Sequence, residues 1–373
     1  MSLAPRSARA GFVLAAALAP LALIAPVAGA QEFGEPFAGT GEVPRGIGLM
    51  DVPDFSAARP VETPEIADPA ALAAQARQLL GEEELATRYG TLTRQLTGPR
   101  AGEETRSEAG AEVLRSLMAP VETPRGLVPG IEARPGAIAV PEAAPVDPTD
   151  TRIQITETLT MPFQHTGQLF MDFGDAGQGS CSGSLIGPQT VLTAAHCVWD
   201  AEAGWAEAIY FVPGANGDGQ FPFGVHEGAT VTVLPGYIDL YHDPRVDVTL
   251  YDLAVLTLAQ PLGRTLGYKG VAVTDELFGF DAHLLSYPGD KPPSTMWYSH
   301  CPVAFLDGLV APEVYIHSCR TFGGSSGGNM FALSDAGDRT WVLGVHVAGV
   351  PDGVRIAVRL HEPYYQWIAQ NWR

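Results

Sequence analysis

Positive charge is scarce in this chain of 373 residues. It has 22 lysine and arginine residues against 42 aspartate and glutamate residues, which gives a net charge of −20 at pH 7. A chain this acidic is repelled by phosphate backbones and by anionic lipid surfaces. We therefore expect no nucleic-acid partner and, once any leader has been removed, no membrane partner.

Long apolar runs are also missing, except at the N-terminus. Residues 11–27 are apolar, follow the basic residues Arg6 and Arg9, and lead into the small-residue stretch 28–30. This order predicts a signal peptide over residues 1–30 and a secreted or periplasmic protein. The alternative is a membrane anchor, but the run is barely long enough and a proline interrupts it.

Aromatic residues and cysteines are nearly absent from residues 31–150. This stretch has 14 prolines, no cysteine, no tryptophan and four aromatic residues, whereas all six tryptophans and all four cysteines come later. Such a composition offers too little apolar surface to fold alone. We expect a proline-rich segment over residues 31–145 that is partly helical or disordered.

Two stretches of this segment have helical patterning. Asp68 can cap a helix with Pro69 in its first turn. One helical face would then carry four apolar side chains, namely Leu85, Tyr89, Leu92 and Leu96. Residues 107–118 form a second candidate helix.

After residue 150 the pattern changes to short alternating stretches separated by Pro-Gly, Asn-Gly and Asp-Gly pairs. The strand-like stretches are 153–159, 167–173, 183–186, 229–234 and 354–360. Many short strands of this kind predict an all-β barrel or sandwich. Residues 362–372 are predicted to end the chain as a helix, with Pro363 in the first turn.

Three short motifs carry residues suited to catalysis. Residues 321–329 read Thr-Phe-Gly-Gly-Ser-Ser-Gly-Gly-Asn, residues 192–197 read Leu-Thr-Ala-Ala-His-Cys, and Asp252 precedes the apolar run 253–258. A serine hydroxyl becomes a good nucleophile when a base removes its proton. A glycine-rich turn exposes that serine and offers N–H groups to an oxyanion. Alone, the glycine–serine motif also fits a flexible surface loop.

His196, Asp252 and Ser326 follow the chain order of a known catalytic triad. On these motifs, residues 151–373 resemble the chymotrypsin-fold (trypsin-like) serine peptidases. The resemblance implies two six-stranded antiparallel β-barrels, followed by a C-terminal helix, with the active site in the cleft. The barrels would span about residues 152–258 and 276–360.

The same resemblance implies a zymogen. Residues 31–145 would then be a propeptide, an intramolecular partner that covers the enzyme or assists its folding, and residues 146–373 would be the peptidase domain. The alternative is a disordered spacer that does neither.

The resemblance also implies a role for each residue of the triad. Ser326 would be the nucleophile, His196 its base, and Asp252 the group that orients the imidazole and stabilises the imidazolium. The N–H groups of Gly324 and Ser326 would form the oxyanion hole. Asp247 is a rival acid, and Asp252 is preferred because an apolar run follows it directly.

The even number of cysteines in an exported chain predicts disulfides. The resemblance implies a bridge between Cys181 and Cys197, and Cys301 and Cys319 are then left to pair. A zinc site is the rival interpretation, because histidines flank the second pair, but the spacing does not suggest convergent ligands. We expect no metal and no cofactor.

Substrate preference follows from a narrower resemblance, to the bacterial glutamyl endopeptidases. Thr321 lies five residues before the nucleophile, and His346 lies in a later strand-like stretch. The hydroxyl and an imidazole N–H can both donate to a carboxylate. Gly349 would let the substrate backbone pair as an extra strand. Arg320 replaces the acidic residue with which trypsin selects basic substrates.

These residues predict a secreted serine endopeptidase that cleaves proteins or peptides through an acyl-enzyme, with Glu or Asp before the scissile bond. One alternative is the same fold with small-residue or broad specificity, in which His346 is a plain core histidine. The other is a non-catalytic homologue that binds a partner, which the complete triad argues against.

Two residues depart from the family: Ser325 replaces the aspartate that pairs with the new N-terminus in the pancreatic enzymes, and Asn329 replaces a common proline.

Overall fold

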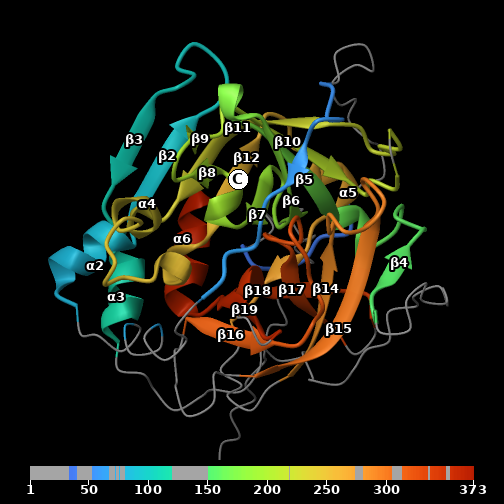
Figure 1. Ribbon diagram of the computed structural model, residues 1–373. Coiled ribbons are helices and arrows are strands. Elements are labelled where there is room, and N and C mark those ends of the chain that lie inside the picture. Colours follow the sequence, from blue (N-terminus) through green and yellow to red (C-terminus); the bar gives the residue numbers. More distant parts are fainter. Residues whose placement is uncertain are drawn as a thin grey trace, which may run out of the picture. The chain divides into compact units, whose positions relative to one another are not determined.

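Figure 1 shows the computed structural model of the chain. It describes residues 33–39, 53–66, 72, 75, 80–119, 150–217, 219–273, 280–304, 313–334, 337–349 and 353–373. The predicted signal peptide, the predicted cap at residues 68 and 69, and the boundary near residue 145 lie outside these residues. No helix in the described part is long and apolar enough to cross a membrane.

The first barrel closes from six antiparallel strands. In spatial order they are β5 (Thr166–Asp172), β6 (Gln178–Leu185), β7 (Thr190–Thr193), β12 (Ala254–Leu258), β11 (His226–Val233) and β10 (Ala208–Pro213). β10 pairs with both β11 and β5, which closes the ring. Branched apolar side chains fill the interior, because alternate residues of a strand point to one face. Leu169, Val191 and Val231 are fully buried there.

The second barrel is built in the same way. Its strands are β14 (Phe280–Ser286), β15 (Met296–Ala304), β16 (Val314–His317), β19 (Arg355–Arg359), β18 (Thr340–Gly349) and β17 (Asn329–Leu333). β13 (Gly270–Val271) adds to β18, and the ring closes where β18 pairs with β19. The predicted architecture of two six-stranded antiparallel barrels is confirmed.

The first strand of this region differs from the prediction. β4 (Ile153–Ile155) was expected in the first barrel, but it pairs with β15 of the second. A buried ionic network explains the placement: Arg152 lies 2.7 Å from Asp150 and also contacts Asp290 of the second barrel's β14–β15 connection. Buried charges must be paired, so the chain is held where both carboxylates can reach the guanidinium.

The segment before residue 120 is more ordered than its composition predicts. It contains β1 (Arg59–Pro60), α2 (Glu82–Arg88), β2 (Thr91–Gln95), β3 (Glu104–Ser107) and α3 (Ala111–Met118). β2 pairs with β3 and with β11, so the segment extends the sheet of the first barrel. The apolar surface that it could not bury alone is therefore buried against the barrel.

The predicted helical face over residues 85–96 is wrong. α2 ends at Arg88, and β2 begins at Thr91. Gly90 marks the break, because a Cβ there would lie 2.2 Å from the backbone oxygen of Ser107 in the next strand. The candidate helix at 107–118 is present but begins only at Ala111.

The predicted C-terminal helix is confirmed as α6 (Glu362–Asn371), with Pro363 in its first turn. Its buried face carries Tyr364, Trp367 and Ile368. The Trp367 indole donates to the carbonyl of Gly90 at 2.7 Å, which ties the end of the chain to the N-terminal segment.

Candidate active site

The structure brings His196 and Asp252 together from two elements of the first barrel. His196 lies in the 3-10 helix η3 (Ala195–Cys197) after β7, and Asp252 lies two residues before β12, the strand paired with β7. The Asp252 Oδ2 atom lies 2.6 Å from His196 Nδ1, and Oδ1 accepts the backbone N–H of His196 at 3.0 Å. Both side chains are buried. The His196 Nε2 atom has no hydrogen-bond partner within the described ranges.

The two adjacent serines face different surroundings. The Ser325 hydroxyl lies 3.2 Å from the Ser286 hydroxyl and accepts the N–H of Phe322, so it is turned into the second barrel. The Ser326 hydroxyl instead faces Thr63 of the N-terminal segment, with 3.4 Å between the two oxygens. Of the two serines, only Ser326 therefore faces the N-terminal segment.

Gly324 adopts the backbone conformation that its predicted role requires. Its φ is +88°, and a Cβ there would meet the carbonyl oxygen of Tyr287 at 2.7 Å. Glycine is favoured at such a position because it has no Cβ. The N–H of Gly324 donates to the carbonyl of Val61 at 2.9 Å, which shows that this N–H is open to a peptide carbonyl.

The rival acid and the family departures have local roles. Asp247 accepts the N–H of Thr249 and caps a short 3-10 helix. The Asn329 amide donates to the carbonyls of Gly327 and Leu192, and so braces the nucleophile turn against β7. Arg320 has its Nε atom 4.0 Å from Asp150 Oδ1, at the start of the peptidase region.

Both expected disulfides are present, between Cys181 and Cys197 and between Cys301 and Cys319. Each pair lies close to a histidine, His196 and His317 respectively, in an arrangement whose ligand atoms could surround a metal ion. Because the sulfurs are bonded to each other, these cysteines offer no thiolate to a metal. The first bridge instead fixes η3, and with it His196, to β6.

The predicted specificity residues lie at one end of the second barrel. Thr321 and Gly349 line a cavity of about 560 Å³. His346, in β18, is fully buried and is not among the residues that line this cavity. Its Nδ1 atom lies 3.2 Å from Nε2 of His317, and its own Nε2 has no hydrogen-bond partner in the described chain.

Arg59 of the N-terminal segment lines this cavity, and so does a second cation, Arg355, which was not predicted. Arg355 stands opposite Gly349 in the β18–β19 pair. Its Nε donates to the Thr321 hydroxyl at 2.9 Å. The sequence showed it only as an arginine in an alternating strand, and the strand register was needed to place it beside Gly349.

The two paired histidines are held neutral. Burial, then the neighbouring His317 and Arg355, keep the pKa of His346 well below its usual value. Burial also lowers the pKa of His317 to about 3. Two neutral imidazoles carry one N–H group each. One of these donates to the other ring, so one N–H of the pair remains for a ligand.

Comparisons with known proteins agree with this geometry. The family model described as Trypsin matches residues 158–277. The chain is 30% identical over 210 residues to a glutamyl endopeptidase of Bacillus licheniformis, covering 55% of this chain and 61% of the relative. This region therefore resembles a trypsin-like serine peptidase domain.

One further relative and one solved structure resemble the same part of the chain. The chain is 29% identical over 207 residues to an extracellular metalloprotease of Bacillus subtilis, covering 54% of this chain and 61% of that protein. A solved structure of Glu endopeptidase in complex with MPD superposes with a TM-score of 0.50 at 26% identity, over 61% of this chain and 98% of that one. The chain thus covers less than two thirds of the curated relatives, and nearly all of the solved domain.

Proposed function

We propose that this chain is the precursor of a secreted serine endopeptidase that cleaves after acidic residues. The observation that supports catalysis most directly is the Asp252–His196 pair, in which the carboxylate binds both the ring and the backbone of the histidine. Among the described residues the buried Nε2 atom has no hydrogen-bond partner, so it is free to accept the proton of a nucleophile that comes within reach.

The reaction uses groups of this chain alone. Ser326 Oγ attacks the scissile carbonyl carbon while its proton passes to His196 Nε2, and Asp252 stabilises the imidazolium. The N–H groups of Gly324 and Ser326 hold the oxyanion. His196 then returns the proton to the leaving amine, the C–N bond breaks, and an acyl-enzyme remains. Water, activated by His196, releases the acid product and restores the Ser326 hydroxyl.

The proposed preference for acidic residues rests on the cavity beside Gly349. Arg355 supplies a permanent positive charge there, since a guanidinium keeps its proton in proteins. The Thr321 hydroxyl accepts the N–H of Arg355, so its own proton remains available to a carboxylate oxygen. If His317 donates to His346 Nδ1, His346 carries its proton on Nε2 as a third donor.

The charge of Arg355 also disfavours broad specificity. An apolar residue before the scissile bond would displace the water around Arg355 without replacing its hydrogen bonds. Desolvating a charged group in this way costs binding free energy. A glutamate would replace the water with charge-assisted hydrogen bonds. The carboxylate is therefore the ligand that this cavity fits best.

We also propose that the N-terminal segment is a propeptide and the intramolecular partner of the domain. Its support is the pairing of β2 with β11 and the burial of Leu72 and Val113 in the core that contains Trp367. The predicted signal peptide supports export.

Matched peptides test the specificity. Four quenched substrates that differ only in Glu, Gln, Lys or Phe before the scissile bond should be cleaved fastest with Glu by enzyme purified from culture medium. Equal rates for Glu and Gln, or a faster rate for Lys, would exclude the acidic cavity. A fluorophosphonate probe tests catalysis itself, because it reacts only with an activated serine. A processed protein that stays unlabelled would be the non-catalytic homologue.

A further inference from the structure

Residues 59–66 lie along the active-site cleft and bond to both of its walls. At the first barrel, β1 pairs in parallel with β6, and the Val61 N–H donates to the carbonyl of Ser180 at 2.9 Å. The Val61 carbonyl then accepts the N–H of Gly324 at 2.9 Å. In Figure 1 this blue segment runs beside the green strands of the first barrel.

The far end of the segment bonds to the second barrel. The Gly349 N–H donates to the carbonyl of Pro64 at 2.9 Å, and the Gly349 carbonyl accepts the N–H of Ile66 at 2.8 Å. These two bonds make a parallel bridge between Glu65 and Gly349. The chain therefore passes from β6 toward β18 as its numbering rises.

The middle of the segment covers the reacting groups. The Thr63 hydroxyl is 3.4 Å from the Ser326 hydroxyl. Glu62 and Pro64 line a cavity of about 620 Å³ that also contains His196. The segment thus contacts the proposed nucleophile and lines the same cavity as its proposed base.

A cleavable peptide must run in the opposite direction. The residue before the scissile bond belongs in the cavity of Thr321 and Arg355, so the acyl part lies beside Gly349. The leaving amine must reach His196, on the side of the first barrel. A substrate therefore passes from β18 toward β6 as its numbering rises, whereas residues 59–66 pass from β6 toward β18.

We infer that residues 59–66 are a built-in peptide inhibitor that occupies the cleft back to front. This rests on the proposed function, because the substrate direction follows from it. In the reversed strand, Ser326 faces a side-chain hydroxyl instead of a carbonyl carbon. The Gly324 N–H, which an oxyanion would need, is already bonded to Val61. Hence no acyl-enzyme forms on this segment, even though it contains Glu62 and Glu65.

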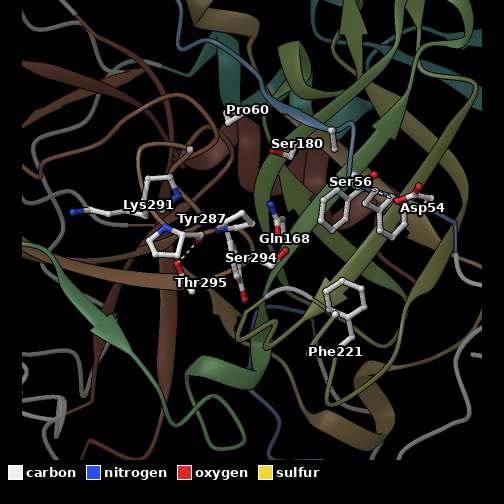
Figure 2. Close-up of a pocket in the computed structure, with 18 of the residues that line it drawn as sticks. Asp54, Ser56, Pro60, Gln168, Ser180, Phe221, Tyr287, Lys291, Ser294 and Thr295 are labelled. Carbon is white, nitrogen blue, oxygen red and sulfur yellow. Dashed lines mark hydrogen bonds between the residues drawn. The ribbon is translucent and has the colours of Figure 1, made fainter.

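The start of the inhibitor is anchored beyond the reacting groups. Phe55 stacks on Phe170 of β5, with ring centroids 4.1 Å apart and planes 3° from parallel. Figure 2 shows the adjoining cavity, of about 450 Å³, with Gln168 of β5 and Tyr287 facing the same space as this part of the segment. A stacked aromatic pair at one end keeps the strand in register along the cleft.

Proline substitution tests inhibition in the full chain. Val61→Pro removes the N–H that bonds to Ser180, whereas Val61→Ala keeps it. We expect the initial rate of cleavage of a quenched glutamyl peptide to rise roughly five- to tenfold in Val61→Pro, as the loss of about one hydrogen bond implies. Val61→Ala keeps the N–H but loses part of a packed side chain, so its rate should lie closer to the wild type than that of Val61→Pro. Equal rates for all three chains would overturn the inhibitor, whereas no cleavage by any of them would count against the proposed enzyme.

Disulfide trapping tests the direction in which residues 59–66 run along the cleft, and it needs no peptidase activity. It uses the Ser326→Ala chain. A Cβ at position 289 would lie 2.5 Å from the Pro60 Cβ, so cysteines there can bridge after a small shift. The pair Pro60→Cys and Gly289→Cys should crosslink under mild oxidation, and the pair Glu65→Cys and Gly289→Cys should not. Peptide mapping that finds only the second bridge would show the substrate direction and refute the inference.

Discussion

Asp252 binds His196 at two points, the ring Nδ1 at 2.6 Å and the backbone N–H at 3.0 Å. The carboxylate therefore sets the ring's tautomer and also the position of its chain. Asp252→Asn should keep the fold but present an amide where the imidazolium needs a charge. We expect kcat to fall on the order of 10⁴-fold, as for the same change in another triad enzyme. A kcat within tenfold of the wild type would show that another acid serves His196, and Asp247→Asn is the control.

The neighbouring serines allow a matched pair of variants. Ser326→Ala should reduce peptide hydrolysis by on the order of 10⁶-fold, the loss found when another serine protease loses its nucleophile. Ser325→Ala removes the contacts with Ser286 and with the N–H of Phe322, neither of which involves His196 or Asp252, and should keep most of the activity. Fluorophosphonate labelling should follow the same pattern. Labelling that persists in Ser326→Ala would move the nucleophile elsewhere.

Arg355→Met should remove the charge of the specificity cavity while keeping most of its volume. A hydrogen bond to a charged group is worth about 1.5–3 kcal/mol. The ratio of kcat/KM for Glu over Gln peptides should therefore fall by at least about tenfold. Arg320→Met is the control, because Arg320 lies 4.0 Å from Asp150. A ratio that falls equally in both variants would assign the effect to overall charge.

Lys269 gives a pH-dependent prediction about stability. It is fully buried, donates to the hydroxyls of Thr166 and Ser184, and lies over the ring of Phe331. Burial lowers the pKa of Lys269 from 10.5 to about 7. Between these values the unfolded chain binds a proton that the folded chain does not, so the free energy of unfolding should rise with pH.

Urea unfolding of the Ser326→Ala chain between about pH 7 and pH 9.5 measures this effect. Adding Lys269→Met should flatten the rise, and the difference between the two curves removes contributions from other titrating groups. Curves that stay parallel over this range would mean that Lys269 keeps its proton when buried.

The disulfides and the pairing of His196 with Asp252 could be predicted from the sequence because each residue lies in a short motif. His196 follows β7 and Asp252 lies just before β12, so the pairing of these two strands brings the side chains together. Arg355 could not be predicted in this way. Its role depends on facing Gly349 across β18 and β19, and alternation alone does not determine the register between two strands.

The N-terminal segment shows a second limit. Apolar residues at 85, 89, 92 and 96 fit a helical period, but Tyr89, Leu92 and Leu96 are buried in the barrel core from a turn and a strand. The deciding contacts are long-range, since β2 forms only where β11 offers an edge. Composition predicted a segment that does not fold alone, but it could not reveal the surface against which the segment packs.

The pairing of β2 with β11 determines whether hydrolysis of a single peptide bond could release the N-terminal segment. Because Leu72 and Val113 share a core with Trp367, residues before 120 are held by the barrel independently of the chain that follows them. Hydrolysis of one bond between residues 120 and 149 would therefore produce a nicked heterodimer whose two polypeptides co-migrate on a native gel and separate only in denaturant. Release of the cleft would require a second event, namely digestion or displacement of the shorter chain.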